Sequence, residues 1–192
     1  MHGMQSTKTE ILESALQLFS KFGYEGTSVQ QVCEAAGITK PSLYHYFGSK
    51  RGLLEALLQS KMSAWTAGLQ KAAAYRNDIT FNIHELIRFT LNFVLQEPLS
   101  FRLYLNLGFA PIKSEAYLVY EPWAKTESAL LLALFNSAAE DHGNMRGRES
   151  YYALSLLGTI RSYGLELLNG GIKADEALIY RVQHQFMHGI FS

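Results

Sequence analysis

The segment from residue 38 to residue 50 limits what this chain can fold into more than any other part of its sequence. Gly37, just before it, can adopt the left-handed conformation that ends a helix. Thr39 can then cap a new helix, and Pro41 is tolerated there because amides in a first turn have no partner within the helix. Gly48 provides a second stop. These signals predict a very short helix between two turns.

The outer surface of this short helix is expected to be polar. Leu43 and Phe47 lie four positions apart, so we expect them to share the buried face. The side chains expected on the remaining surface are those of Thr39, Lys40, Ser42, Tyr44, His45 and Tyr46. A short helix that presents a cation, hydroxyls and a ring nitrogen to solvent is typical of a DNA-recognition helix. We predict that Lys40, Ser42 and His45 lie nearest base edges.

The residues before this helix complete a helix-turn-helix pattern. Thr27 and Ser28 can each cap a helix, and each is followed three positions later by a glutamine that can return the hydrogen bond. An upstream helix that opens near Thr7 is expected to place Phe22 on its inner side. Three helices would then share one small core, with the third facing the major groove. We predict that Thr27, Ser28, Tyr44 and Lys50 contact phosphates.

At these residues the chain resembles the tetracycline-repressor (TetR) family of bacterial transcriptional regulators. The pattern runs through Ala15-Leu16-Gln17-Leu18-Phe19, Phe22-Gly23-Tyr24-Glu25-Gly26-Thr27-Ser28, Ala35-Ala36-Gly37-Ile38, Leu43-Tyr44-His45-Tyr46-Phe47, Ser49-Lys50 and Leu53-Leu54. It covers roughly residues 7 to 60, about a third of the chain. One departure is Arg51-Gly52, where family members usually carry an acidic residue or another helix former. The resemblance implies a dimeric, ligand-responsive repressor in which two helices from each subunit form a four-helix bundle.

The charge distribution fits a nucleic-acid partner only locally. The chain has a net charge of zero, yet no acidic residue occurs between Glu34 and Glu55. Lys40, Lys50 and Arg51 all fall inside that window. Affinity for phosphate depends on the charge of the contact face rather than on the sum over the chain. An ordinary solvated basic face is the alternative interpretation.

The rest of the sequence predicts an all-α protein of about nine helices. Further helices are expected at about 80–96, 99–109, 114–137, 147–169 and 174–190. We expect a DNA-binding domain at residues 1–50 and a helical ligand-binding and dimerisation domain at 51–192. No apolar run is long enough for a membrane span, and no N-terminal signal segment is evident, which predicts a cytoplasmic protein.

Two apolar stripes near the C-terminus predict a homodimer. One comprises Tyr151, Leu154, Gly158, Arg161, Leu165 and Leu168, and the other comprises Ile179, Val182, Phe186 and Ile190. Gly158 and Ser162 are small and four positions apart, which allows close helix packing. A helix pair buried inside one subunit would give the same pattern. We favour the interface, because a single recognition helix reads too few bases to be specific.

The middle of the chain is rich in aromatic residues, and we predict a small-molecule pocket there. The expected lining residues are Phe89, Phe93, Tyr104, Trp123 and Arg161. Arg161 interrupts an apolar face, which fits either an anionic ligand or an ion pair with Glu121 or Glu127. The pocket should be bounded by the helices near 80–96, 99–109, 114–137 and 147–169.

Two other classes of function compete with this interpretation. An enzyme would need a nucleophile arrangement or a phosphate-binding loop, and neither is recognisable. His184 and His188 have a spacing that suits a metal, but no acidic residue accompanies them in a zinc-hydrolase motif. A module that binds only protein would leave the surface from Lys40 to Lys50 unexplained. We therefore predict a DNA-binding regulator that has an unidentified small-molecule effector and lacks catalytic residues, cofactor, metal and membrane partner.

Overall fold

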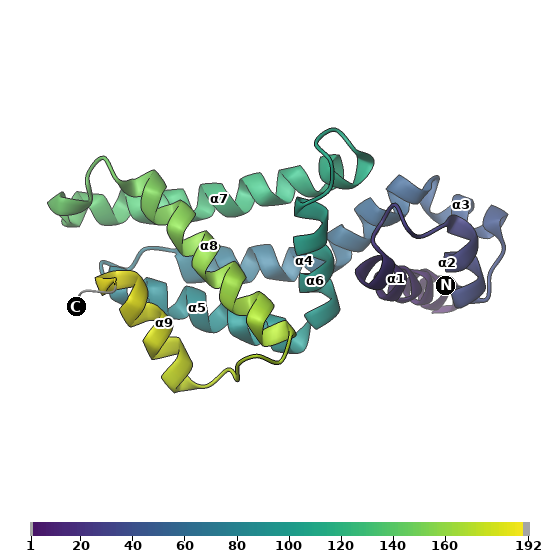
Figure 1. Ribbon diagram of the computed structural model, residues 1–192. Coiled ribbons are helices and arrows are strands. Elements are labelled where there is room, and N and C mark those ends of the chain that lie inside the picture. The colour runs from purple at the N-terminus through teal and green to yellow at the C-terminus, as the bar shows by residue number, and fades with distance from the viewer. Residues whose placement is uncertain (1, 190–192) are drawn as a thin grey trace. The chain divides into compact units, whose positions relative to one another are not determined.

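The computed structural model describes residues 2–189, with side chains from Thr7 onward, and these residues form α-helices without any strand (Figure 1). The nine α-helices of the described residues are α1 (His2–Phe22), α2 (Val29–Ala36), α3 (Lys40–Phe47), α4 (Lys50–Ala73), α5 (Ile79–Gln96), α6 (Pro98–Gly108), α7 (Glu115–Asp141), α8 (Glu149–Leu168) and α9 (Glu176–His188), with a short 3₁₀ turn at Gly143–Met145. The predicted all-α class and the five later helices are confirmed.

The helices group into two compact units. The first contains Met1–Ser63 with Leu99–Trp123, and the second contains Ala64–Pro98 with Ala124–Ser192. Helices α4 and α7 each contribute to both units. The boundary expected at residue 50 concerns a division of functions, which these packing units do not test, and it remains a prediction.

The ends of the short helices form as the sequence indicates. Ser28 caps α2 and exchanges hydrogen bonds with Gln31 in both directions, which is the reciprocal capping arrangement. Gly37 ends α2 with a φ of 65°, in the left-handed region that favours glycine. The Thr39 hydroxyl accepts from the amide of Ser42 and caps α3. Local hydrogen bonding therefore fixes the turn between α2 and α3.

Two predictions about α1 are wrong. This helix begins at His2, upstream of the expected cap at Thr7. Phe22 was expected on the inner side but is half exposed, and the Lys21 ammonium lies 5.0 Å from its ring centroid. The core of the first unit is instead closed by Phe19 and Tyr24, whose ring centroids are 5.4 Å apart.

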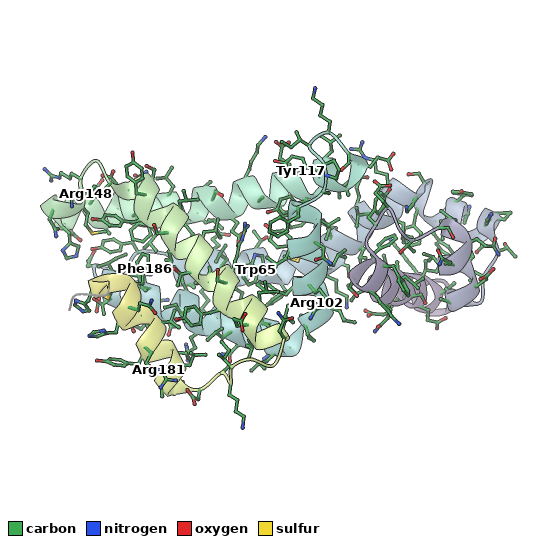
Figure 2. The ribbon with its side chains drawn as sticks, in the orientation of Figure 1. Trp65, Arg102, Tyr117, Arg148, Arg181 and Phe186 are labelled. Carbon is green, nitrogen blue, oxygen red and sulfur yellow. The ribbon has the colours of Figure 1, made fainter. Side chains whose placement is uncertain are left out.

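In the second unit, α5 packs against α8 and α9 (Figure 1). The α9 residues Ile179 and Val182 are buried in this core, and the Phe186 ring lies 6.4 Å from that of Phe135 (Figure 2). The α9 stripe that was expected at a dimer surface therefore faces its own subunit, and that prediction is wrong. Ile190 lies outside the described residues.

A buried asparagine fixes the turn between α4 and α5. The Asn82 side chain donates to the carbonyls of Ala72 and Ala74 at 2.8 and 2.9 Å, and it accepts from the amide of Arg76 at 3.3 Å. These groups lie at the end of α4, where carbonyls have no partner within the helix. Asn82 therefore determines where the chain leaves α4 and enters α5.

Candidate functional site

Helix α3 presents the polar surface that the sequence predicts. Thr39, Lys40, Tyr44 and His45 are exposed, while Ser42 and Tyr46 are partly buried. On the opposite side, Leu43 is completely buried and fixes the helix to the core. The His45 and Tyr46 rings meet edge to face, with centroids 5.7 Å apart. The outer surface of a helix capped at both ends therefore includes all of the side chains predicted to approach bases.

The structure corrects one of the predicted phosphate contacts, that of the Thr27 side chain. Its residue is only 1% exposed, and its hydroxyl donates to the carbonyls of Gly23 and Leu18 at 2.9 and 3.3 Å. The hydroxyl ties the loop before α2 to α1, so it is unavailable to a phosphate. Ser28, the neighbouring cap, is exposed at the same helix end.

Lys50 lies against an aromatic ring at the start of α4. Its ammonium is 4.1 Å from the ring centroid of Tyr24, and the Tyr24 hydroxyl donates to the Glu115 carboxylate at 2.7 Å. Burial lowers the pKa of Lys50, and the nearby carboxylates of Glu25 and Glu115 oppose that shift. Burial, followed by the hydrogen bond to Glu115, raises the pKa of Tyr24. The Lys50 ammonium therefore lies on the Tyr24 ring, and its contact with a phosphate remains a prediction.

Lys8 of α1 is a cation near this surface that the sequence analysis did not identify. Its ammonium lies 5.9 Å from the ring centroid of Phe47, at the end of α3. The two residues are far apart in sequence, and no local motif connects them. Only the packing of α1 against the helix-turn-helix brings this positive charge to the candidate interface.

The acidic side chains Glu34 and Glu55 near the candidate interface contact neighbouring residues, and the thiol there is buried. Glu34 of α2 accepts a hydrogen bond from Gln30 at 2.7 Å, and Arg51 pairs with Glu55 at 2.8 Å. Cys33 is buried, and burial raises the pKa of its thiol. The thiol is therefore a core group rather than a nucleophile.

The residues predicted to line a ligand pocket fall in different units. Phe89 and Phe93 belong to the second unit and border an open groove of about 450 Å³ along α4 and α5. Tyr104 and Trp123 belong to the first unit, where the buried Tyr104 ring packs 4.9 Å from that of Tyr120. Whether all five residues meet at one ligand remains a prediction.

Arg161 forms an ion pair with Glu127, which was the predicted alternative to binding an anionic ligand. Its guanidinium donates to the carboxylate of Glu127, which is almost completely buried on α7. A buried charge of this kind requires a partner, and the pair joins α7 to α8. A further role in ligand binding remains a prediction.

Part of the predicted dimer stripe lies open on α8. Tyr151, Leu154, Gly158 and Leu165 are exposed. A groove of about 460 Å³ lies between α8 and α9, bordered by Gly158 and by the small residues Ser155, Thr159 and Ser162. Exposed apolar side chains beside small residues are suited to close packing against a second helix pair. The geometry therefore leaves an apolar face without a partner within the subunit.

Within the described residues, no group of three or more histidine, cysteine or acidic side chains could hold a metal ion. His184 and His188 stack with ring centroids 4.6 Å apart. The described helices also include none that is long and apolar enough to cross a membrane.

Comparisons with known proteins relate this arrangement to a family. Residues 11–57 match the model of "Bacterial regulatory proteins, tetR family". The chain is 37% identical over 103 residues to the HTH-type transcriptional regulator RutR of Escherichia coli (strain K12), covering 53% of this chain and 47% of that protein. It is 30% identical over 105 residues to the biofilm operon icaADBC HTH-type negative transcriptional regulator IcaR of Staphylococcus aureus (strain Newman), covering 54% and 55%. The chain therefore matches about half the length of these curated relatives.

Structural similarity extends over nearly the whole chain. The crystal structure of AibR in complex with isovaleryl coenzyme A and operator DNA matches with a TM-score of 0.73 and 24% identity, covering 93% of this chain and 97% of that one. At this identity the match establishes the fold. The helix-turn-helix segment at residues 11–57 is therefore similar to that of the tetR family of bacterial regulatory proteins, and the chain shares its fold with the AibR structure.

Proposed function

We propose that this protein is a dimeric transcriptional regulator that binds a double-stranded DNA operator through α3. The observation that supports the proposal most directly is the exposed polar face of α3, held in place by the buried Leu43 and by caps at both ends. A helix of this kind can enter the major groove, where Lys40 and His45 reach base edges. Ser28, Tyr44 and Lys50 then approach the phosphates.

We further propose that the regulator is a repressor released by a small molecule. IcaR is named as a negative regulator, which supports repression, and AibR was crystallised in complex with isovaleryl coenzyme A and operator DNA, which supports a small-molecule effector. An effector changes DNA affinity only if it binds two conformations of the protein with different affinity. Helix α4 is suited to the coupling, because it begins directly after α3 and continues into the second unit.

Dimerisation is proposed through the exposed face of α8 together with the groove beside α9. Two recognition helices related by a two-fold axis would read two half-sites, which supplies the specificity that one short helix lacks. We place the protein in the cytoplasm, where its DNA lies, and propose no enzymatic activity. A module that binds only protein would not require a cluster of Lys40, Ser42, Tyr44 and His45 on one helix face.

Selection from a random library of duplex DNA, followed by fluorescence anisotropy over a range of salt concentrations, tests the DNA-binding proposal. His45→Ala is expected to relax the preference at one or two base positions. Lys50→Ala is expected to weaken binding to all sequences alike and to reduce the salt slope by about one unit. Lys173→Ala, a matched change at an exposed lysine in the second unit, should leave both unchanged. Failure to enrich any sequence would refute the regulator proposal.

The salt slope also distinguishes two positions of the Lys50 ammonium. If it leaves the Tyr24 ring and meets a phosphate, its loss reduces the number of released counterions. An unchanged slope in Lys50→Ala would show that the ammonium stays on Tyr24 when DNA is bound, and that part of the proposal would be abandoned.

A further inference from the structure

We propose that the groove along α4 and α5 binds an organic anion that has a flat aromatic body and a charge of about two. The groove has a volume of about 450 Å³ and lies wholly within the second unit. This volume is within the usual range for small-molecule sites, roughly 300–1,000 Å³. Its lining residues include basic side chains, which form a cationic half, and phenylalanine rings, which form an apolar half.

The cationic half carries an excess of positive charge. Lys71, Arg76 and Arg88 border the groove, and Glu85 is the one carboxylate among the lining residues. Glu85 already pairs with Arg88 at 2.6 Å. Neither Lys71 nor Arg76 forms an ion pair with any described residue, so the groove holds two cations whose charge is not neutralised. Guanidinium and ammonium groups in this number match a dianionic phosphate or a pair of carboxylates.

The apolar half is formed by aromatic rings that pack at tilted angles. Phe89 and Phe93 of α5 border the groove, and Trp65 (Figure 2) packs against both, with ring centroids 5.3 and 4.8 Å away. Phe89 lies so close to α4 that a Cβ on Gly68 would be 2.1 Å from a ring atom. Glycine at position 68 therefore allows the Phe89 ring to pack directly against α4. Phe81, at the cationic end, is exposed and lies 5.6 Å below the Arg76 guanidinium.

The backbone that carries Lys71 and Arg76 is held in place without a ligand. Asn82 holds the backbone of Arg76 and the carbonyl of Ala72, which lies next to Lys71 in α4. A site whose backbone is already ordered loses less conformational entropy on binding than a mobile loop does. A ligand there would press on the last turns of α4, the helix that follows the recognition helix. Any effect of this ligand on DNA affinity rests on the proposed function, whereas binding of the ligand to the groove does not.

Isothermal titration calorimetry with four small probes tests this site. Phenyl phosphate and phthalate each carry a ring and two negative charges, inorganic phosphate carries charge alone, and phenol carries the ring alone. We expect one or both of the first two to bind, and the other two to bind at least about tenfold more weakly, since each lacks half of the contacts. Stronger binding of phenyl phosphate assigns the site to organic phosphates, and stronger binding of phthalate assigns it to dicarboxylates.

Variants identify where the probe binds. Lys71→Gln and Arg76→Gln are exposed changes that should leave the fold intact, and each is expected to weaken the better probe by about tenfold. Phe81→Ala should weaken it while leaving the affinity for inorganic phosphate unchanged. Lys173→Gln, an exposed lysine outside the groove, is the matched control. Equal binding by wild type and both charge variants, or equal binding of phenyl phosphate and inorganic phosphate, would overturn the proposal.

A DNA-binding measurement without ligand separates this proposal from the preceding one. If the groove variants bind DNA like the wild type but the probes do not bind, only the ligand site fails. If the probes bind as expected but no DNA sequence is selected, only the regulator proposal fails.

Discussion

Leu154→Ala is expected to weaken dimerisation strongly while leaving the subunit fold unchanged. Leu154 is 70% exposed on α8, so it contributes little to the core of its own subunit. Burying a whole leucine side chain stabilises by about 1.5–3 kcal/mol, so covering the exposed part contributes about 1–2 kcal/mol per subunit. A two-fold interface contains the residue twice, which gives about 2–4 kcal/mol, or roughly a 30- to 700-fold increase in the dimer Kd.

Sedimentation equilibrium over a range of protein concentrations measures this Kd directly. Ile112→Ala is the matched control, because Ile112 is 76% exposed in the connection between α6 and α7 and belongs to the first unit, whereas the proposed face belongs to the second. It should leave the Kd unchanged. A Leu154→Ala protein with the wild-type Kd, or a wild type that is monomeric at micromolar concentration, would refute the proposed interface.

Gly158→Arg tests the same face by adding a group instead of removing one. A Cβ at position 158 would meet no atom within 4 Å in the subunit, so the substitution should not disturb the fold. In the dimer it would introduce two bulky charges into a close-packed seam, where an unpaired charge costs several kcal/mol (about 3–5). We expect a folded monomer with an unchanged circular dichroism spectrum. An intact dimer would place the interface elsewhere.

Three further substitutions test how the fold is held. Asn82→Leu should reduce the free energy of unfolding in urea by about 1–3 kcal/mol, because it leaves buried backbone groups near the end of α4 without partners. Gly37→Ala should cost about 1 kcal/mol, because its φ is in the left-handed region; an unchanged urea midpoint would contradict this. Tyr24→Phe tests a pH dependence. Since the folded state raises the pKa of Tyr24 above its ordinary 10.0, the stability advantage of wild type over the variant should be constant below that pH and decline above it, and urea unfolding at pH 8 and pH 10.5 checks this.

The sequence by itself determined the elements whose signals are local. Caps, glycine stops and apolar spacing act over three or four residues, so Gly37, Thr39 and Leu43 were correctly assigned before any tertiary contact was known. The order of the later helices followed from the same kind of signal. The polar face of α3 was predictable for the same reason, because its composition is read within a single helix.

Where the sequence allowed two arrangements equally well, only the tertiary structure decided which one the protein adopts. Thr27 and Ser28 are both suitable caps, but the loop geometry buries Thr27 and leaves the capping role to Ser28. The α9 stripe could have faced a partner or its own core, and packing against α5 decided for the core. Periodicity identifies which residues share a face of a helix, but the neighbour on that face depends on the rest of the chain.

Contacts between residues far apart in the sequence could not be predicted from the sequence either. The Lys8 ammonium at Phe47, the Tyr24 hydrogen bond to Glu115 and the grouping of Lys71, Arg76 and the phenylalanine rings in one groove all join separate segments of the chain. None of these pairs has a fixed spacing that a motif could record. Hydrogen bonds within a turn are determined by local sequence, whereas contacts across a bundle depend on how whole helices pack, and that is decided only when the chain folds.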